Sequence, residues 1–429
     1  ATGEKKYLDL AQLIVTQADQ HPALNFLSQA LAGTDVAEIG TGKAYQVIWN
    51  LVGLAKLHRA TGDIKFLSAV QKAWASIQQY HLTLGGGPWG GVGQRSREIF
   101  NCAAVFSPYG YVETCSTFSW IQLNRELLAI TGEAKYADEI ERSAYNDLLG
   151  AQAPDGNDWC YYSFPNGKRV HTTYWRCCKS SGAMALEELP ALAYSLVTAD
   201  DIAVNLYGPN EAALETAAAG IVRLSQTTNY PLDGNVRILV TPQRVALFSI
   251  RLRIPAWATD TTIQVNGCDW PVAAVAGSYA VLKRDWHGND EIALCFSMPA
   301  LLHRKSSRNV QESKSPDGAP ICQEVMRFDY VAITRGPLVY ACPLIDGFKM
   351  EETIGIAEDD AASLLEIVDN PSGHDGPAIR LNLGYRAPLM FIPYYEAGGR
   401  RDGIFDRIFH QWLQNHPRHR RLGKIGGDI

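Results

Sequence analysis

The sequence predicts a multidomain protein in which a helical region precedes β-sandwich domains. Up to about residue 200, apolar residues recur at helical spacing, and two such segments end in Thr-Gly-Asp or Thr-Gly-Glu before another helix starts. Beyond that point the period changes to two, with turn residues between short alternating segments. We therefore predict a helical domain at 1–200, a β-sandwich at 201–304, and a second β-rich domain with an irregular tail at 305–429.

The helical segments predicted in the first domain are 7–19, 44–61, 65–80, 114–131, 134–149 and 181–198. Helices that follow each other across a glycine stop indicate repeated αα-hairpins. A glycine-rich stretch at 85–93 interrupts the series, and a loop between helices is a natural place for a functional site.

The alternating segments predicted as strands are 202–207, 236–240, 246–254, 279–282, 291–296, 329–334 and 338–341. Pro255 ends the third of them, since proline cannot continue a strand ladder. The polar stretch 305–318 is predicted to be a linker or an exposed loop.

Charge and hydropathy exclude several classes of partner. The net charge of -6 gives no electrostatic reason to expect binding to nucleic acid or to an anionic membrane. No apolar run approaches the ~18 residues that a membrane-spanning helix needs. The basic run at 416–421 is interpreted as a solvated tail. Because the chain begins at Ala1 and not at a methionine, a signal peptide cannot be judged, and both a cytoplasmic and a periplasmic location are retained.

Cysteine usage indicates metal binding. The chain has nine cysteines, an odd number, which favours a reducing compartment or a metal site over a disulfide scaffold. Cys177 and Cys178 are adjacent, and Glu113 and Cys115 lie upstream with one residue between them. Three thiols and one carboxylate form a plausible tetrahedral set for Zn²⁺. Two separate disulfides, or free buried cysteines, are the alternatives from spacing alone.

Several segments, in this order, resemble glycoside hydrolase family 127, the β-L-arabinofuranosidase type. The similarity runs from about residue 40 to about residue 340. The segments that carry it are Gly90-Gly91-Val92-Gly93, Glu98, Glu113-Thr114-Cys115, Tyr136-Ala137-Asp138, Glu141 to Asn146, Tyr161-Tyr162, Cys177-Cys178, Arg251 to Trp257, and Arg335 to Tyr340.

The resemblance implies an (α/α)6 barrel followed by two β-sandwich domains. It also implies a zinc ion held by Glu113, Cys115, Cys177 and Cys178. Cys177 would be the catalytic nucleophile and Glu98 the general acid/base. Metal coordination would keep the thiol deprotonated for attack on the anomeric carbon. Without the resemblance, Glu98 would be taken for a surface carboxylate paired with Arg95 or Arg97.

Two residues are assigned to the sugar pocket by the same resemblance. Tyr162 aligns with a tyrosine near the site, although a core tyrosine would look the same. Lys43 stands where the family has a histidine that touches the sugar, so this pocket could suit an acidic sugar or another hydroxyl pattern. Lys43 could equally be a surface lysine at a helix start. The chain also departs from the family at Trp175 and Lys179, where cysteine and proline are usual.

Length is the largest departure from the family. About seven helices are predicted before residue 200, whereas an (α/α)6 barrel has twelve. The sequence therefore predicts an incomplete barrel without its N-terminal half. Such a half barrel would expose an apolar face, which favours a homo-oligomer.

The leading hypothesis is a zinc-dependent retaining glycosidase that acts on β-L-arabinofuranosides or related plant-glycan sugars, as found in bacteria. The alternative is a non-catalytic carbohydrate-binding or scaffold protein of the same fold with structural zinc, because zinc held by four protein ligands is usually structural. A sugar lyase or epimerase would need a Tyr/His base pair, which the sequence does not offer.

Overall fold

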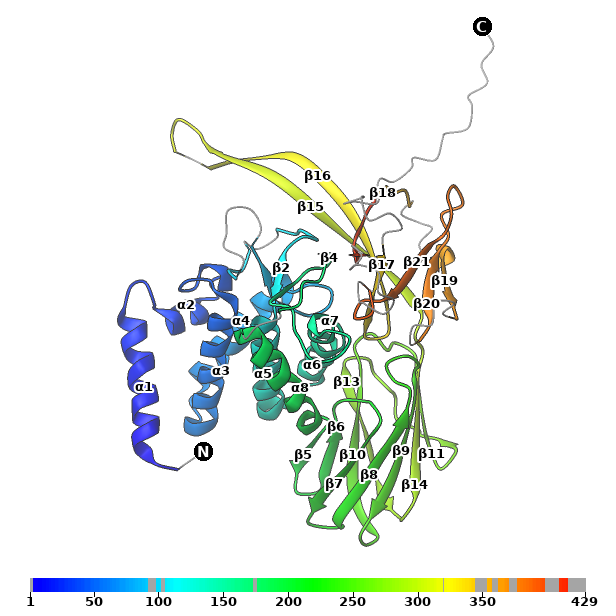
Figure 1. Cartoon of the computed structure of the whole chain (residues 1–429). Coiled ribbons are helices and arrows are strands. Elements are labelled where there is room, and N and C mark those ends of the chain that lie inside the picture. The colour runs from blue at the N-terminus through cyan, green and yellow to red at the C-terminus, as the bar shows by residue number, and fades with distance from the viewer. Residues whose placement is uncertain are drawn as a thin grey trace.

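The computed structural model describes residues 3–91, 98–101, 105–172, 176–318, 320–343, 353–356, 362–369, 376–397 and 409–415, of which 308–314, 320–326 and 362 are described by their backbone only. The first part of the chain is helical (Figure 1). Its elements are α1 Lys5–Gln20, α2 Phe26–Ala32, η1 Val36–Glu38, α3 Ala44–Thr61, α4 Ile64–Tyr80, α5 Thr114–Thr131, α6 Ala134–Ser143, η2 Ala144–Leu148, α7 Leu149–Ala151 and α8 Cys177–Leu192.

Glycine stops organise the helices into hairpins. α3 ends at Gly62 (φ 73°) and α5 ends at Gly132 (φ 68°), and each glycine N–H donates to the carbonyl four residues earlier. Glycine takes this left-handed conformation without steric cost. The next helix starts two residues later in both cases, and α3 packs on both α4 and α5. The predicted αα-hairpins are confirmed. The described helices establish a helical region but not a closed ring of twelve helices.

The last helix was predicted at the wrong place. The sequence predicts a helix at 181–198, but α8 runs over Cys177–Leu192, and β5 (Tyr194–Thr198) pairs with β6 (Asp201–Val204). Pro190 lies in the last turn of α8, where its missing N–H removes one intrahelical hydrogen bond and its ring crowds the preceding turn, which weakens the end of the helix. The aromatic and β-branched residues that follow suit a strand.

A β-sandwich follows the helical region. One sheet has the order β13-β10-β6-β5, the other β12-β11-β14-β9-β8-β7, and a continuous apolar core lies between them. Besides β5 and β6, the strands are β7 Asn210–Thr216, β8 Gly220–Thr228, β9 Asn235–Pro242, β10 Ala246–Ile254, β11 Thr261–Val265, β12 Cys268–Asp269, β13 Ser278–Trp286 and β14 Asp290–Phe296. Burial alternates along β8 and β9, as the period of two predicts.

The predicted linker at 305–318 is wrong. β15 (Ala300–Lys314) and β16 (Pro320–Arg335) pair along their whole length as a long antiparallel ribbon, which extends from the third sheet in Figure 1. Only the turn at 315–318 corresponds to the expected loop. A two-stranded ribbon has no buried face that imposes apolar alternation, so its polar sequence was interpreted as loop.

Besides a small sheet of β1 (Trp89–Gly90), β2 (Tyr111–Glu113) and β3 (Tyr162–Ser163) in the helical region, a third large sheet completes the described β structure. Its strands beyond the ribbon pair in the order β18-β23-β16-β17-β21-β20-β19, and β22 pairs with β17. They are β17 Leu338–Pro343, β18 Thr353–Ile354, β19 Leu365–Val368, β20 Ala378–Leu381, β21 Leu389–Pro393, β22 Phe409–His410 and β23 Leu413–Asn415, with the 3-10 turn η3 Ala362–Leu364 before β19.

Buried polar contacts join the three parts. The Arg253 side chain is fully buried and ion-pairs with Asp138 and Glu141 of α6, which joins β10 to the helical region. β4 (Asn166–Gly167) pairs with β22, which joins the helical region to the third sheet. A buried charge needs such partners, because an unpaired charge in the interior is strongly destabilising.

Some sequence predictions fall outside the described residues: the basic run at 416–421, Trp175, Arg95, Arg97 and part of the glycine-rich loop. None of the helices in the described ranges is both long and apolar enough to cross a membrane.

Candidate active site: a glutamate and three thiols beside a second glutamate

The four predicted metal ligands meet in the structure. One ligand atom from each of Glu113, Cys115, Cys177 and Cys178 lies within 4.8 Å of the others. The Cys115 and Cys178 Sγ atoms are 3.3 Å apart, too far for a disulfide, and Cys115, Cys177 and Cys178 are all free thiols. The disulfide alternative is therefore excluded for these three cysteines.

Helix starts bring the cluster together. Glu113 ends β2 (Tyr111–Glu113) and is the N-cap residue of α5, and Cys177 and Cys178 are the first two residues of α8. α5 packs against α8. The N-terminal end of a helix carries partial positive charge, which favours thiolates and carboxylates there.

Close packing fixes the position of α8. A Cβ atom at Gly182 would lie 2.4 Å from the Trp159 ring, so only glycine allows this approach. The Ser181 Oγ lies 3.2 Å from the Cys115 Sγ and gives the cluster another polar neighbour. Ser181 was not identified from the sequence, since a serine within a helix has no distinguishing pattern.

The cluster is buried except at Cys177. Glu113, Cys115 and Cys178 are buried, whereas Cys177 is exposed. The Glu113 Oε1 accepts a hydrogen bond from the Cys178 thiol at 3.8 Å, and Glu113 Oε2 is buried with no hydrogen-bond donor in the described part of the chain. An unsatisfied buried carboxylate oxygen is costly unless a proton or a cation satisfies it.

The pKa values of this group reflect its burial. Burial raises the pKa of Glu113 to about 8, and the charge of Cys115 adds to the effect. The hydrogen bond from Cys178 lowers the pKa of the Cys115 thiol to about 6. That same hydrogen bond, together with burial, raises the pKa of Cys178, and burial raises the pKa of Cys177. Without a cation, Cys115 would be the group of the cluster that is mainly ionised at neutral pH, whereas Glu113, Cys177 and Cys178 would stay mostly protonated.

Tyr161 connects Glu98 to this cluster by hydrogen bonds. The Tyr161 hydroxyl donates to Glu98 Oε1 at 3.0 Å and accepts from the Cys177 thiol at 3.6 Å. The Tyr162 hydroxyl donates to the same oxygen at 2.9 Å, and Lys43 Nζ lies 2.5 Å from Glu98 Oε2. Both residues assigned to the sugar pocket therefore contact the predicted acid/base. The partner of Glu98 is Lys43, and the arginines first considered lie outside the described residues.

Tyr161, like Ser181, was not assigned a role from the sequence. It precedes β3 (Tyr162–Ser163), which pairs with β2 so that Tyr162 lies opposite Glu113. Strict alternation would direct adjacent side chains to opposite faces, yet both tyrosine hydroxyls reach Glu98, because Tyr161 lies just outside the strand. The Tyr161-Tyr162 pair was the available signal.

Hydrogen bonds keep the Glu98 carboxylate ionised. Burial alone would raise its pKa, but the hydrogen bonds from Lys43, Tyr162 and Tyr161 outweigh burial and lower it. Partial burial would likewise lower the pKa of Lys43, yet the hydrogen bond to Glu98 raises it. Each partner thus favours the charged form of the other.

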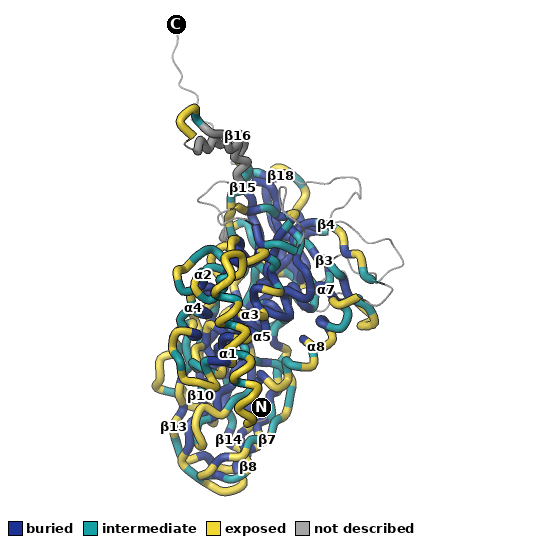
Figure 2. Tube along the Cα trace, turned by 90° about the vertical axis from the view of Figure 1, so that its left-hand side faces the viewer, coloured by how far each residue is buried: buried dark blue, intermediate teal, exposed yellow. Residues whose placement is uncertain are grey.

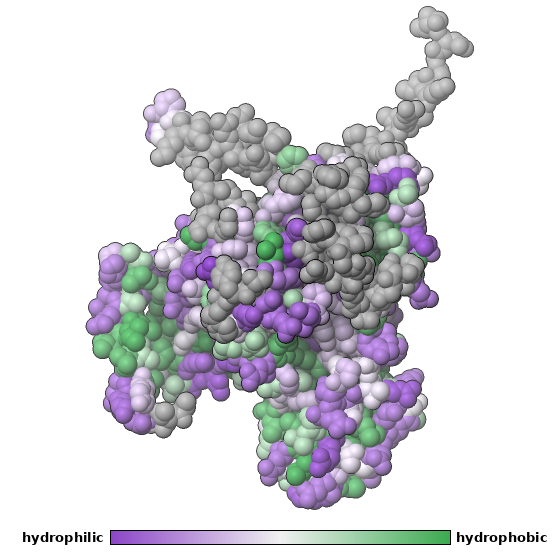
Figure 3. Space-filling view, in the orientation of Figure 1, coloured by the Kyte–Doolittle hydropathy of each residue, from purple (hydrophilic) through white to green (hydrophobic). Residues whose placement is uncertain are grey.

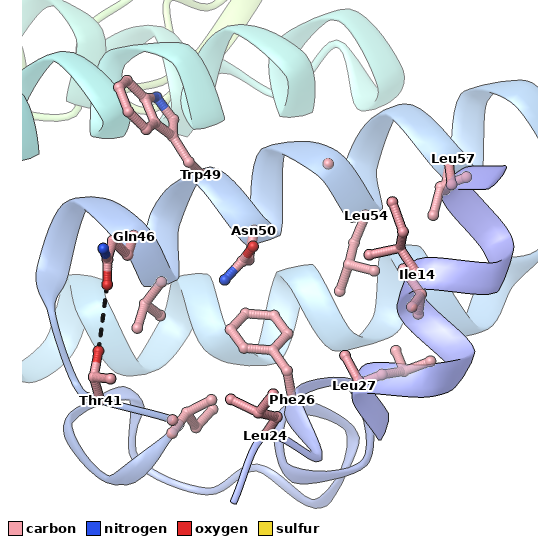
Figure 4. A pocket seen from close by; sticks show the side chains of 17 residues that line it. Ile14, Leu24, Phe26, Leu27, Thr41, Gln46, Trp49, Asn50, Leu54 and Leu57 are labelled. Atoms are coloured by element: carbon pink, nitrogen blue, oxygen red, sulfur yellow. Dashed lines mark hydrogen bonds between the residues drawn. The ribbon is translucent and has the colours of Figure 1, made fainter. Parts of the chain in front are cut away.

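A cavity elsewhere in the helical region differs in chemistry from the thiol cluster. An apolar groove of about 440 Å³ lies between α1, α2 and α3, and its lining contains no titratable side chain (Figure 4). Ile14, Phe26 and Leu54 are among the apolar side chains drawn there, and Thr41 and Gln46 are hydrogen-bonded at 3.5 Å. This groove has no group that could perform acid–base or nucleophilic chemistry, so the thiol cluster remains the candidate active site.

The comparisons with known proteins match this chain to β-L-arabinofuranosidases. Residues 1–191 match the family model described as "Beta-L-arabinofuranosidase, GH127 catalytic domain", and residues 201–298 match the GH127 middle domain. A curated non-reducing end β-L-arabinofuranosidase from Bifidobacterium longum subsp. longum is 23% identical over 473 residues, covering 96% of this chain and 68% of the relative.

Solved structures share the fold. A GH127 β-L-arabinofuranosidase from Geobacillus stearothermophilus T6 superimposes with a TM-score of 0.74 at 23% identity, covering 97% of this chain and 70% of that one. A further GH127 β-arabinofuranosidase superimposes with a TM-score of 0.75 at 23% identity. The alignment covers 97% of this chain and 66% of that protein's chain.

Proposed function

The chain belongs to glycoside hydrolase family 127, and from this we propose that it is a retaining glycosidase that cleaves β-L-arabinofuranosides or related plant-glycan sugars. Members of this family are glycoside hydrolases. The curated relative and the structural neighbours carry β-arabinofuranosidase names, which support the sugar class. A barrel-type arrangement of the helices is part of the same proposal.

One observation carries the proposal. The exposed Cys177 thiol belongs to a cluster of three thiols and a carboxylate, and Tyr161 links it to Glu98. A nucleophile and a proton donor must both reach the anomeric centre from one pocket. The arrangement supports Cys177 as nucleophile and Glu98 as general acid/base.

The donor set fits a zinc ion. Glu113, Cys115, Cys177 and Cys178 would hold it, and the buried Glu113 Oε2 is an acceptor that no described donor satisfies. Thiolate and carboxylate ligands in a group of four are what Zn²⁺ prefers. When bound, the ion would supply the positive charge that keeps these thiols deprotonated at neutral pH.

The proposed reaction has two steps. In the first, the Cys177 thiolate attacks the anomeric carbon, the bond to the leaving oxygen breaks, and Glu98 gives its proton to that oxygen. In the second, the Glu98 carboxylate removes a proton from water, the water oxygen attacks the same carbon, and the carbon–sulfur bond breaks. Two inversions at one carbon retain its configuration.

Tyr161 and Tyr162 would position the acid/base. Both hydroxyls donate to Glu98 Oε1, which orients the carboxyl group. Burial and the neighbouring acceptors raise the pKa of both tyrosines, so they remain donors throughout the working pH range. Their role is to hold Glu98 at the angle that proton transfer requires.

A non-catalytic scaffold with structural zinc is the second candidate. The Lys43–Glu98 ion pair favours it, because an ionised glutamate cannot protonate a leaving group. Labelling of thiols in the metal-loaded protein separates the two: an enzyme should have a reactive Cys177, and a scaffold should have an inert one.

The direct test is hydrolysis of an aryl β-L-arabinofuranoside by the metal-analysed protein. We expect about one zinc per chain, and Cys177→Ser should lower kcat/KM at least about 1,000-fold, since a serine hydroxyl is a far weaker acid and a poorer ligand. Cys295→Ser, at an exposed cysteine of β14, is the matched control and should retain activity. Near-parental activity of Cys177→Ser would refute the nucleophile assignment.

A further inference from the structure

The ion pair at Glu98 places a cation inside the proposed catalytic pocket. Lys43 Nζ lies 2.5 Å from Glu98 Oε2, with side-chain exposures of 28% and 18%. The two tyrosine hydroxyls occupy the other oxygen, so three donors surround one carboxylate. The ammonium group also lies 4.7 Å from the centre of the Tyr45 ring. A partly desolvated cation of this kind is an anchor for a negative group.

The backbone sets this position. Lys43 and Ile99 form an antiparallel bridge, the Ala44 N–H donates to the Glu98 carbonyl, and the Phe100 N–H donates to the Gly42 carbonyl, both at 2.9 Å. Gly42 has a φ of 65°, and a Cβ there would lie 2.6 Å from the Ala37 carbonyl oxygen. The lysine is therefore held beside the acid/base by main-chain pairing and not by a chance side-chain contact.

Helix stability does not explain the lysine. Lys43 is the N-cap residue of α3 and makes no side-chain cap hydrogen bond. Helix N-termini prefer Ser, Thr, Asp or Asn and disfavour cations. A positive charge at this position makes sense only through what it faces in the pocket.

The proposed chemistry removes the counter-ion of Lys43. Glu98 must carry a proton in the first step, and a protonated Glu98 no longer balances the ammonium charge. Among the described residues, Glu98 is the only carboxylate within 4 Å of Lys43 Nζ. A neutral sugar would leave the cation unpaired at the moment of reaction, whereas a substrate carboxylate would pair with it and release Glu98 to accept a proton.

We propose that Lys43 is a specificity residue that binds a carboxylate on the sugar, so that the enzyme prefers acidic furanosides over neutral arabinofuranosides. This inference rests on the proposed glycosidase function and names its substrate class. The Lys43 ammonium group is one compact point charge, and one carboxylate on the sugar would balance it.

Two matched substrates test this: an aryl β-L-arabinofuranoside, and the same glycoside with its C5 hydroxymethyl group oxidised to a carboxylate. We expect the parent enzyme to prefer the acid at least about tenfold in kcat/KM. Lys43→Met should abolish the preference by raising KM for the acid much more than KM for the neutral glycoside, and Lys43→Arg should restore part of it. Lys56→Met, at an exposed lysine of α3, is the control for general charge loss.

The outcomes separate this inference from the function on which it rests. A parent enzyme that cleaves the neutral glycoside as well as the acid, or a preference that survives Lys43→Met, overturns the role of Lys43 and leaves the glycosidase intact. If neither glycoside is cleaved, the glycosidase proposal fails. Calorimetric titration with free L-arabinuronic acid then decides about Lys43: binding that Lys43→Met abolishes supports the inference, and the absence of such binding overturns it.

Discussion

Helices α1 and α5 have similar lengths but opposite surroundings. α5 has 18 residues, of which 13 are buried, including Trp120 and Leu127. α1 has 16 residues and none of them is buried. Even its apolar residues Leu10 and Ile14 are 54% and 57% exposed. Figure 2 shows α1 exposed along its length, and Figure 3 shows hydrophobic side chains gathered over the α1–α3 side of the helical region.

The well-packed helix α5 carries residues of the candidate active site, whereas the exposed helix α1 carries none. α3, α6 and α8 surround α5, and the N-terminal end of α5 carries Glu113 and Cys115 into the cluster. The main packing partners of α1 are α2 and α3, and the apolar groove lies beside it. A site that needs sub-ångström positioning is built on the covered helix, where packing fixes its side chains.

The largest expected effect tests whether the α5 side performs chemistry. Glu98→Gln should lower turnover of substrates with poor leaving groups about 100- to 10,000-fold, because glutamine cannot protonate the departing oxygen. Aryl glycosides should lose much less, since their leaving group needs little protonation. Steady-state kinetics on both substrate types measures the split. Glu215→Gln, at an exposed glutamate of β7, should change neither, and an equal loss on both types would contradict the acid/base role.

The next prediction compares the two helices directly. Leu127→Ala in α5 should lower the free energy of unfolding by about 2–5 kcal/mol, because it leaves a cavity at a fully buried position. Leu10→Ser in α1 should change it by no more than about 0.5 kcal/mol, as expected for an exposed residue. Denaturant unfolding of both variants gives the comparison. A large loss for Leu10→Ser would mean that α1 is covered in solution.

A smaller effect comes from Glu113 in the metal-free protein. Its pKa is raised from 4.5 to about 8, so the folded state binds a proton that the unfolded state has released. Stability should therefore fall as pH rises from about 4.5 towards 8. Between pH 4.5 and 6, where the Cys115 thiol is still protonated, the fall should be about 1–2 kcal/mol.

The matched variant isolates this contribution. Glu113→Gln has no proton to release, so the unfolding free energy of the parent should fall relative to that of the variant over the same pH range in metal-free buffer. Added zinc should reverse the trend for the parent, since a ligand must be deprotonated to bind it. A pH-independent difference would show that Glu113 is not held protonated by its burial.

The smallest expected effect concerns the pH profile of the neutral substrate. The first step needs protonated Glu98, so kcat/KM should fall as pH rises through its pKa. The Lys43 hydrogen bond helps to lower that pKa against the effect of burial. Lys43→Met should therefore move the alkaline limb to higher pH, whereas Lys56→Met should leave it in place. A limb that does not move would assign the titration to another group.

Sequence reasoning succeeded where a local pattern carries the information. Helical spacing and glycine stops located α3 to α6, and alternation located five of the ten strands of the sandwich, namely β6, β9, β10, β13 and β14. It failed at 305–318, where the ribbon lacks a buried face, and at 194–198, where an apolar run suits helix and strand alike. In the ribbon the paired strand selects the backbone conformation, whereas at 194–198 the position of Pro190 and the β-branched residues were the local signals that the helical spacing outweighed.

The site divides in the same way. Glu113, Cys115, Cys177 and Cys178 were selected from sequence because thiols and a carboxylate at short spacing have a known ligand chemistry. The contact of Tyr161 with Glu98, the Ser181 neighbour and the Lys43 ion pair were decided by tertiary structure. Residue type determines which chemistry is available, but pairing between segments far apart in the chain determines which groups touch and in which protonation state.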